Sequence, residues 1–322
     1  RQRGFATADI TQLANLCVNC RGCYYACQYT APHQFAINVP AALARVRRES
    51  WQEFAWPTPL AKGFHTRGVM LAVFAVIATA CVLALATALR PDSGEGFYAV
   101  MSHTLMISVF LPAAFLPLLS LVIGTRRYWK TVGGKPTTWA HWRDAMAAIA
   151  TLKGLSAGHG DGCNYEDDDR FSHARRVAHG LTAAGFLLCL GATTVATLMH
   201  YFLDWPAPYA WYTPPKVLGV PGGVLLCVGT AWLALLKRQA DPTLGDEPAW
   251  GGDMAFVLLL FAVSFTGLAL YALGDTALMS TLLVVHLGTV LVFFVSLPFS
   301  KMAHAFYRVA AHLREIQIQH GH

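Results

Sequence analysis

Charged residues are scarce in this chain. Asp, Glu, Lys and Arg make up 13% of its 322 residues, whereas 55% are hydrophobic. An ordinary soluble domain has roughly a quarter of its residues charged, so the composition excludes that class. Apolar stretches run from about residue 68 to residue 300, and about 20 such residues suffice to cross a bilayer. The sequence therefore predicts a polytopic membrane protein.

Three further features are missing. The first residues show no signal-peptide pattern of basic, apolar and small-residue regions. The chain begins at Arg1 without a methionine, and we expect further residues to precede it. No pattern of an acid–base pair or an activated nucleophile is present. The sequence therefore favours a protein that positions cofactors, with the chemistry supplied by them.

Six apolar segments are expected to span the membrane. Backbone groups in lipid must satisfy their own hydrogen bonds, so segments of this length are predicted to be helices. The predicted spans are 68–89, 97–124, 177–203, 217–236, 254–273 and 280–299.

The link at 125–172 is too long for a bare connection. Within it, "TTWAHWRDAMAAIATL" predicts an amphipathic helix that lies at the membrane interface. One side of that helix would carry Trp139, Trp142, Met146 and Ile149.

The positions of the basic residues predict the topology. If the amino terminus is cytoplasmic, 22 of the 24 Lys and Arg residues lie on the cytoplasmic side, leaving Arg90 and Lys216 outside. This asymmetry follows the positive-inside rule. It predicts a multi-pass protein of a bacterial inner membrane with both termini cytoplasmic. Because the basic residues flank spans and form no single stripe, the net charge of +6 does not indicate nucleic-acid binding.

The stretch "CVNCRGCYYAC" contains Cys17, Cys20, Cys23 and Cys27 at C-x2-C-x2-C-x3-C spacing. Disulfides are rare in the reducing cytosol, and zinc sites usually pair two short cysteine or histidine units across a loop. The observed spacing is that of a bacterial ferredoxin run, which binds a [4Fe–4S] cluster. The sequence therefore favours an iron–sulfur site over zinc.

The role of the fourth cysteine has two interpretations. In two-cluster ferredoxins the fourth cysteine of a run ligates the other cluster, so Cys27 would serve a second cluster whose own run precedes Arg1. Alternatively, Cys27 closes a single cluster. We favour the first interpretation. Cys163, in "GDGCNYEDDD", is taken as a lone loop cysteine that is not a ligand, and three more cysteines are small buried hydrophobes within spans: Cys81, Cys189 and Cys227.

Four histidines suggest haem. His179 and His200 lie 21 residues apart at the third span, and His286 and His304 lie 18 residues apart at the sixth. At about 100° per residue, each pair lies near one helix face. In antiparallel helices, His179 would meet His304 at the cytoplasmic edge and His200 would meet His286 at the outer edge. Matched pairs of this kind predict axial ligands of two stacked b-type haems.

Several alternatives accompany this prediction. His103 could replace either outer ligand, and His173 could compete with His179. His179 and His304 could instead be interfacial side chains that snorkel. Basic residues near the inner pair are candidates for binding haem propionates: Arg175, Arg176, Lys301 and Arg308. Gly185 and Gly288 are expected to leave room for the macrocycle.

The predicted architecture is mainly α. A ferredoxin-like iron–sulfur segment at 1–62, truncated upstream, precedes a cytochrome b-like bundle of six transmembrane helices at 63–316. That bundle binds haem and carries the cytoplasmic loop at 125–172. Residues 317–322 form a tail.

Two stretches, "ANLCVNCRGCYYACQYTAPHQFAINVP" and "GDGCNYEDDDRFSHARR", carry a resemblance to a known family. The chain resembles the tricarballylate/citrate utilisation protein B family, and the membrane half of a flavoprotein fusion in cobalamin synthesis, over nearly all its length. Its last helix resembles nitrate reductase gamma-type cytochrome b, which has two axial histidines on one helix. The family normally has two cysteine runs, and this chain shows the second.

The resemblance implies a membrane electron-transfer subunit. Such a subunit takes electrons from a partner flavoprotein (FAD) dehydrogenase that oxidises tricarballylate or a related acid. It then passes them through [4Fe–4S] and haem b to quinone. Two other functions remain possible from the sequence: electron transfer with a thiol or sulfur redox partner, and a transporter with a histidine relay and a zinc or redox sensor.

Overall fold

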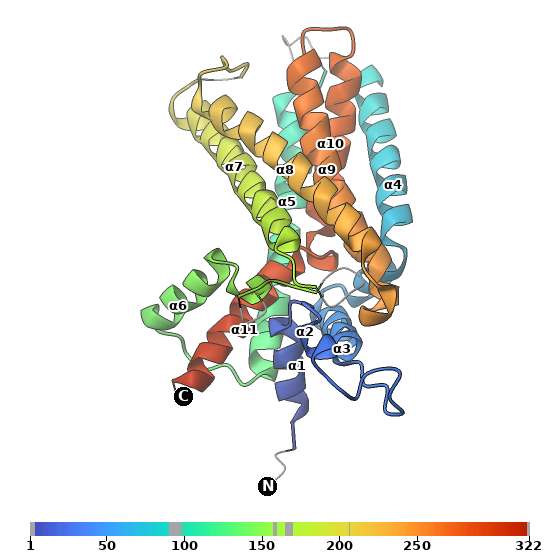
Figure 1. Ribbon diagram of the computed structural model, residues 1–322. Coiled ribbons are helices and arrows are strands. Elements are labelled where there is room, and N and C mark those ends of the chain that lie inside the picture. The colour runs from blue at the N-terminus through green and yellow to red at the C-terminus, as the bar shows by residue number, and fades with distance from the viewer. Residues whose placement is uncertain are drawn as a thin grey trace.

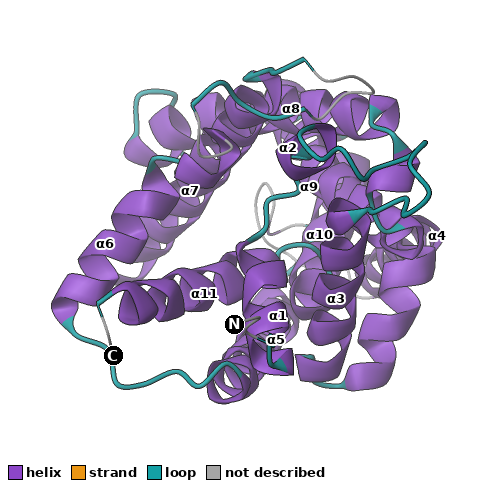
Figure 2. Ribbon diagram, turned by 60° about the horizontal axis from the view of Figure 1, so that its bottom comes forward, coloured by secondary structure: helices purple, strands orange, loops and turns teal. Residues whose placement is uncertain are grey.

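The computed structural model describes residues 4–89, 98, 100–156, 160–164, 170–205 and 207–320. Over these residues the chain is mainly helical and forms no β-strand (Figures 1 and 2). Its one β-type contact there is an isolated antiparallel bridge between Cys163 and Ser172. The mainly α prediction is confirmed.

Six helices are long and apolar enough to cross a membrane, which confirms the number of predicted spans. Their ends differ from the prediction by several residues, because polar turns extend most of them beyond the apolar run. The long helices are α4 (Thr58–Leu89), α5 (His103–Thr131), α7 (Ala174–Phe202), α8 (Pro214–Gln239), α9 (Trp250–Leu273) and α10 (Met279–Ser296).

Shorter helices flank the bundle. Three precede it: α1 (Thr7–Leu16), α2 (Gly22–Tyr25) and α3 (Val39–Phe54). Two more are α6 (Trp139–Ala150), in the predicted loop, and α11 (Ala303–Gln319), at the carboxyl end. The 3-10 turns are η2 (Lys153–Ser156), η3 (Pro242–Leu244), η4 (Glu247–Ala249) and η5 (Leu297–Phe299).

The sixth span does not continue into the helix of His304. The turn η5 and the extended backbone of Ser300 (φ −100°, ψ 179°) separate α10 from α11. Pro298 within this turn lacks the N–H that a continuing helix needs. His286 therefore lies on α10 and His304 on α11, and the prediction that they share one helix face was wrong.

Small residues bring neighbouring helices close together. A Cβ atom on Gly185 would lie 2.5 Å from the backbone N of Leu226, so this glycine lets α7 pack against α8. A Cβ atom on Gly288 would lie 3.2 Å from the backbone N of Ala80 on α4. Both glycines thus serve helix packing, as in other membrane bundles, and the prediction that they leave room for a haem was wrong.

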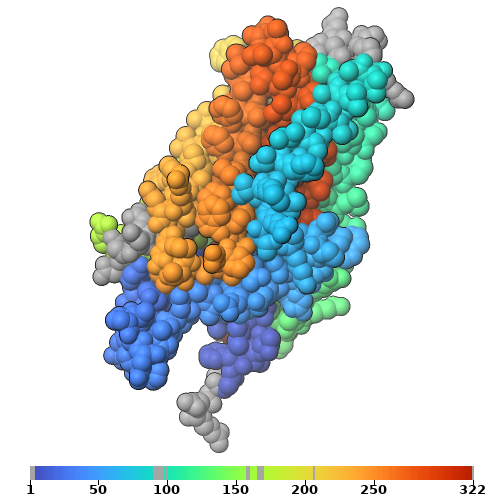
Figure 3. Space-filling model, turned by 90° about the vertical axis from the view of Figure 1, so that its right-hand side faces the viewer, coloured from blue at the N-terminus to red at the C-terminus, as the bar shows by residue number. Residues whose placement is uncertain are grey.

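The outer surface of the long helices is apolar. On α4, Phe74, Val82 and Leu85 are 72%, 65% and 60% exposed. Figure 3 shows this helix running along one face of the molecule beside α9 and α10. An apolar surface of this extent is unusual for a soluble monomer and fits contact with lipid, so the chain is a multi-pass membrane protein.

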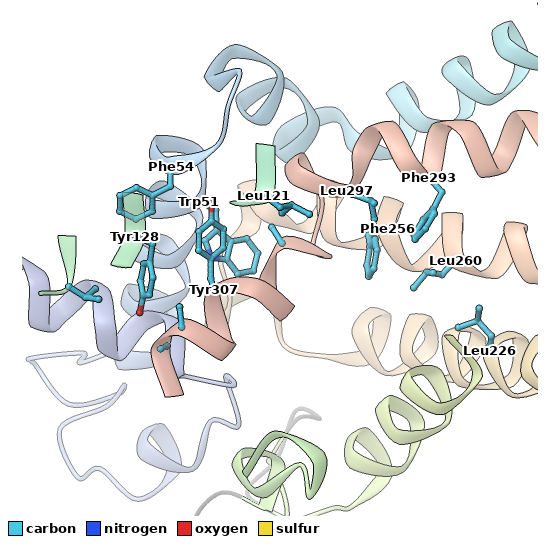
Figure 4. Packing of buried hydrophobic residues seen from close by; sticks show 14 residues of the cluster. Trp51, Phe54, Leu121, Tyr128, Leu226, Phe256, Leu260, Phe293, Leu297 and Tyr307 are labelled. Atoms are coloured by element: carbon cyan, nitrogen blue, oxygen red, sulfur yellow. The ribbon is translucent and has the colours of Figure 1, made fainter. Parts of the chain in front are cut away.

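The amino-terminal helices pack against one end of the bundle. A buried aromatic cluster joins α3 to α5 and α11, with Trp51 stacked on Tyr307 at 6.0 Å between ring centroids and Phe54 close to Tyr128 (Figure 4). The Tyr128 hydroxyl donates to Gln12 Oε1 (2.6 Å), and Gln12 Nε2 donates to the carbonyl of Ala311 (2.7 Å). Satisfied buried polar groups of this kind fix one arrangement. The residues that follow α1, including the cysteines, are therefore held in place.

Two further features concern the predicted boundaries. The helix α4 begins at Thr58, runs through the predicted boundary at 62/63, and bends at Arg67 (φ −120°, ψ 25°). The predicted helix in the 125–172 link is confirmed as α6. Its Trp139 and Met146 are 83% and 47% exposed, whereas His141 is buried, with its ring centroid 5.8 Å from that of His320. The helix α6 packs against α11 (Figure 2).

Candidate functional site

The cysteine loop, residues 17–27, connects α1 to the segment before α3 and contains the short helix α2. Its turn uses left-handed backbone at Asn19 (φ 55°) and Arg21 (φ 66°). Backbone N–H groups point at the sulfurs: Asn19 N donates to Cys17 Sγ (3.3 Å), and Gly22 N donates to Cys20. Hydrogen bonds to cysteine sulfurs are among the contacts that stabilise iron–sulfur clusters and set their potentials.

Three of the sulfurs act on one another electrostatically. Burial, together with the thiolates of Cys17 and Cys20, raises the pKa of Cys23. Cys27 lies beyond α2, and its sulfur accepts from Tyr29 N (3.4 Å). Which cluster each of the four cysteines would ligate stays a prediction.

Within the described ranges, no three His, Cys, Asp or Glu side chains are placed as ligands of a single metal ion. A zinc site needs four ligands at about 2.0–2.3 Å from one ion. An iron–sulfur cluster is a larger body that takes cysteine thiolates. The backbone N–H groups that donate to Cys17 and Cys20 are contacts of the kind that iron–sulfur clusters use.

The sequence suggested that Cys163 is an isolated loop cysteine, but in the structure it lies against the cysteine loop. It is 1% exposed, and its thiol contacts the sulfur of Cys20 and lies 3.5 Å from the carbonyl oxygen of Leu155, to which it can donate. The backbone N of Asn164 donates to the carbonyl of Cys20 (2.9 Å), which fixes the contact. The Cys163 thiol lowers the pKa of Cys20 to about 6, and the same pairing, with burial, raises the pKa of Cys163.

A sequence signal for this contact exists in the two glycines before Cys163. Gly160 (φ 100°) and Gly162 (φ 102°) adopt backbone angles that other residues rarely reach. Such a pair predicts a specific tight turn. The turn presses Cys163 against Ser172 through two backbone hydrogen bonds of 3.0 and 3.1 Å, and it points the thiol at the cysteine loop.

Three arginines hold the cysteine loop by its carbonyl groups. Arg47 Nη1 and Arg308 Nη2 donate to the carbonyl of Cys17 at 2.6 and 3.0 Å. Arg175 Nη1 donates to the carbonyl of Asn19 at 3.1 Å. Arg308 and Arg175 come from α11 and α7 of the membrane domain, so the loop is attached directly to the bundle. Charge-assisted bonds of this kind are stronger than neutral ones.

The predicted propionate partners thus bind protein atoms. Arg175 and Arg308 bind the cysteine loop, and Lys301 forms an ion pair with Asp253. Arg176 donates to Ser156 Oγ (3.0 Å) and to the carbonyl of Thr151 (2.9 Å), on the side of η2.

His179 and His304 lie side by side. Their ring centroids are 6.1 Å apart, and their planes are inclined by 83°. Two imidazoles on opposite sides of one iron have centroids about 6 Å apart, since each metal–nitrogen bond is about 2 Å and each ring adds about 1 Å. Nδ1 of His304 bonds to the carbonyl of Lys301, which leaves Nε2 available for a metal, as is usual for ligating histidines. The inner pair therefore fits the axial ligands of a haem.

This histidine pair lies directly under the cysteine loop. His179 follows Arg175 by four residues on α7, and His304 precedes Arg308 by four residues on α11, which is about one helical turn in each case. The arginines that bind the loop therefore belong to the same helical turns that carry the histidines.

The outer histidines are arranged differently from the prediction. His200 lies beside His103, with 4.7 Å between ring centroids, which is shorter than an intervening iron requires. His286 is on α10, and its Nδ1 bonds with Thr266 Oγ1 (3.0 Å). Among the described residues no ring contact links His200 to His286, because the α7–α8 hairpin leans away from α10 at this end (Figure 1). The alternative ligand His103 is thus the neighbour of His200.

Comparisons with known proteins agree with this arrangement of a cysteine segment and a membrane domain. The family model described as "Citrate utilization protein B Fer4-like domain" matches residues 1–53, and the model "Citrate utilization protein B" matches residues 62–320. A protein of Escherichia coli, "Citrate utilization protein B", is 41% identical over 315 residues, covering 96% of this chain and 83% of the relative. No solved structure matches.

A Fer4-like domain that bears the cysteine loop indicates an iron–sulfur electron-transfer role. The membrane domain and the amino-terminal domain both match the same family, and the relative is similar over most of its length. The chain therefore belongs to the citrate utilization protein B family.

Proposed function

We propose that this protein is a cytochrome b-like electron-transfer subunit of the bacterial inner membrane. It carries electrons from a partner flavoprotein dehydrogenase of the tricarballylate or citrate type, through [4Fe–4S] and haem b, to quinone. The observation that carries the proposal is the 6.1 Å pair of His179 and His304 beneath the cysteine loop. The cysteine loop and both termini lie on the cytoplasmic side, as the distribution of Lys and Arg favours.

The chain's own residues would hold the two cofactors. Cys17, Cys20 and Cys23 would ligate the cluster, and His179 and His304 the inner haem. When bound, these groups supply one-electron transfer. The protein fixes their relative position through Arg175 and Arg308, which donate to carbonyls of the cysteine loop. A second haem at the other end would take one ligand from the His103–His200 pair, whose rings are too close to hold an iron between them, and the other from His286.

The first test is the cofactor content of the full-length protein, purified without oxygen. We expect a b-type haem spectrum near-stoichiometric with protein and an EPR signal of a reduced [4Fe–4S] cluster. Cys20→Ser should abolish that EPR signal and leave the haem spectrum unchanged, whereas Cys27→Ser should damage a different signal. Zinc in place of iron, with no haem, would refute the proposal and favour the transporter function.

The second test is the donor. Mixing reduced flavoprotein with membranes that contain this chain should reduce the haem rapidly, and added quinone should oxidise it again. Membranes from cells that lack this chain serve as the control. A haem that is reduced by thiol donors but by no flavoprotein would refute the flavoprotein link and favour a sulfur redox partner.

A further inference from the structure

Two segments from distant parts of the chain meet at Cys20. One is the cysteine loop, and the other is the tight turn of residues 160–164, which precedes α7 and meets the loop beside α2 (Figure 1). The Cys163 thiol contacts the Cys20 sulfur, and the backbone N of Asn164 donates to the Cys20 carbonyl (2.9 Å). The turn is thus attached to Cys20 at both its side chain and its backbone.

The turn holds the thiol of Cys163 in one place. Two backbone hydrogen bonds of 3.0 and 3.1 Å join Cys163 to Ser172. Gly162 has a positive φ of 102°, and a Cβ atom there would lie 2.3 Å from the Ser172 carbonyl oxygen, so the turn requires glycine at this position. Cys163 is also 1% exposed. Bulk water therefore does not compete for the thiol, and the turn sets where the thiol lies.

The surroundings of Cys163 determine where its proton points. The Arg175 guanidinium contacts the Cys163 sulfur, and a guanidinium donates hydrogen bonds but accepts none. Two acceptors are within reach of the thiol proton: the carbonyl oxygen of Leu155 at 3.5 Å, and the Cys20 sulfur. A cysteine that ligates iron is a thiolate, and a charged acceptor forms a stronger hydrogen bond than a neutral carbonyl. In the cluster-bound protein the proton therefore points at Cys20.

The sulfur of Cys20 thus has a donor of a different kind from that of Cys17. Cys17 accepts from the backbone N of Asn19 (3.3 Å), whereas Cys20 accepts from Gly22 N and is also contacted by a side-chain thiol. Hydrogen bonds to the sulfurs are among the factors that set the reduction potential of an iron–sulfur cluster. Reduction adds negative charge, and a donor beside the sulfur stabilises that charge, so each such bond raises the potential.

We propose that the Cys163 thiol donates a hydrogen bond to the ligand sulfur of Cys20 and raises the reduction potential of the cluster at the cysteine loop. Cys163 acts through Cys20 and does not itself ligate iron. A higher potential favours the entry of electrons from the partner flavoprotein. The inference rests on the proposed function, because it concerns the cluster that this function requires.

The test is a potentiometric titration of the full-length protein, purified without oxygen, with the EPR signal of the reduced cluster as the readout. Cys163→Val replaces the thiol by an apolar group of similar size that cannot donate, so it should lower the midpoint potential. One lost hydrogen bond shifts the reduction equilibrium by up to about tenfold, which is about 59 mV for one electron. Cys163→Ser keeps a donor and should restore most of the potential.

The control is Cys81→Val, which changes an exposed cysteine of α4 and should leave the potential unchanged. Equal potentials in Cys163→Val and the unmodified protein would overturn the inference. Equal lowering in Cys163→Val and Cys163→Ser would also overturn it, because packing and not the proton would then be responsible.

The amplitude of the EPR signal separates other outcomes. Loss of the signal in both Cys163 variants would overturn the inference, since the residue would then be needed to assemble the cluster. If Cys163→Val alone lacks the signal, Cys163→Ala takes its place in the titration. A missing cluster signal in the unmodified protein is instead a failure of the proposed function.

Discussion

The two ends of the helical bundle hold their histidines in different ways. At the end that bears the cysteine loop, His179 and His304 are 6.1 Å apart, and a backbone carbonyl orients His304. At the opposite end, His200 lies 4.7 Å from His103, with Tyr201, a half-exposed residue, beside both rings. The first pair has the spacing of haem ligands, whereas the second is too close to hold an iron between its rings.

The difference follows from what supports each end. At the cysteine-loop end, contacts join residues from distant parts of the chain, such as Arg308 with the carbonyl of Cys17 and Gln12 with the carbonyl of Ala311. These buried bonds stop the helix ends from moving relative to one another. At the opposite end the α7–α8 hairpin packs mainly on itself and on α9, so the ends of α7 and α10 are not tied together. A site that must keep a cofactor at a fixed distance from another requires the first kind of support.

The largest expected effect is on the inner pair. His304→Ala removes one of two facing imidazoles and should eliminate one haem entirely, measured as haem per protein chain by the pyridine haemochrome assay. His312→Ala, two turns further along the same helix, is the control and should keep full haem content. Normal haem content in His304→Ala would show that the inner pair is not a ligand pair.

The next effect concerns the opposite end. Because the rings of His103 and His200 are too close to hold an iron between them, at most one of the two can ligate a haem here, so alanine at either position should lower haem content by less than His304→Ala does. The low-spin haem region of the EPR spectrum would report this. If His200→Ala and His286→Ala instead share one phenotype while His103→Ala is silent, the pairing predicted from the sequence is correct and the two ends resemble each other.

A smaller effect is expected from the attachment of the cysteine loop. Arg308→Gln removes a charge-assisted bond to the carbonyl of Cys17 and should make opening of residues 17–27 easier by about 1–3 kcal/mol. Hydrogen exchange of the amides in this loop measures that change. Arg314→Gln is the control, since Arg314 on the same helix binds the carbonyl of Val132 instead. Equal exchange in the two variants would mean that the arginine does not anchor the loop.

The smallest effect concerns the Cys20–Cys163 contact in the cluster-free protein. The contact lowers the pKa of Cys20 from its ordinary value of 9.0 to about 6. The contact therefore contributes its full stabilisation of the folded state above about pH 9, where Cys20 is ionised in both the folded and the unfolded protein. That stabilisation is lost as the pH falls through about 6. Cys163→Ala should raise the Cys20 pKa and slow its alkylation at pH 7 by roughly tenfold or more. Mass spectrometry of iodoacetamide-treated protein measures the rate, with Cys27, which lies beyond α2, as the internal control. An unchanged rate would show that Cys163 does not act on Cys20.

Part of this arrangement could be predicted from the sequence because its causes are local. The six spans follow from runs of apolar residues, and α6 follows from its pattern of tryptophan and aliphatic residues. The iron–sulfur site could likewise be predicted from the cysteine spacing, because a four-iron cluster requires closely spaced thiolates on a tight loop. The contact between His179 and His304 could also be predicted from the sequence, because both residues lie near the same end of antiparallel helices.

The tertiary structure decided the rest, because it depends on how helices cross and on what their ends touch. Matched depth predicted that His200 faces His286, but the tilt of the α7–α8 hairpin brings it to His103. Spacing along the chain could not show that Arg175 and Arg308 bind carbonyls of the cysteine loop, or that Cys163 lies against Cys20. These contacts join residues more than 140 positions apart. A sequence pattern predicts which residues share one face of a helix, but it does not predict which other segment of the chain contacts that face.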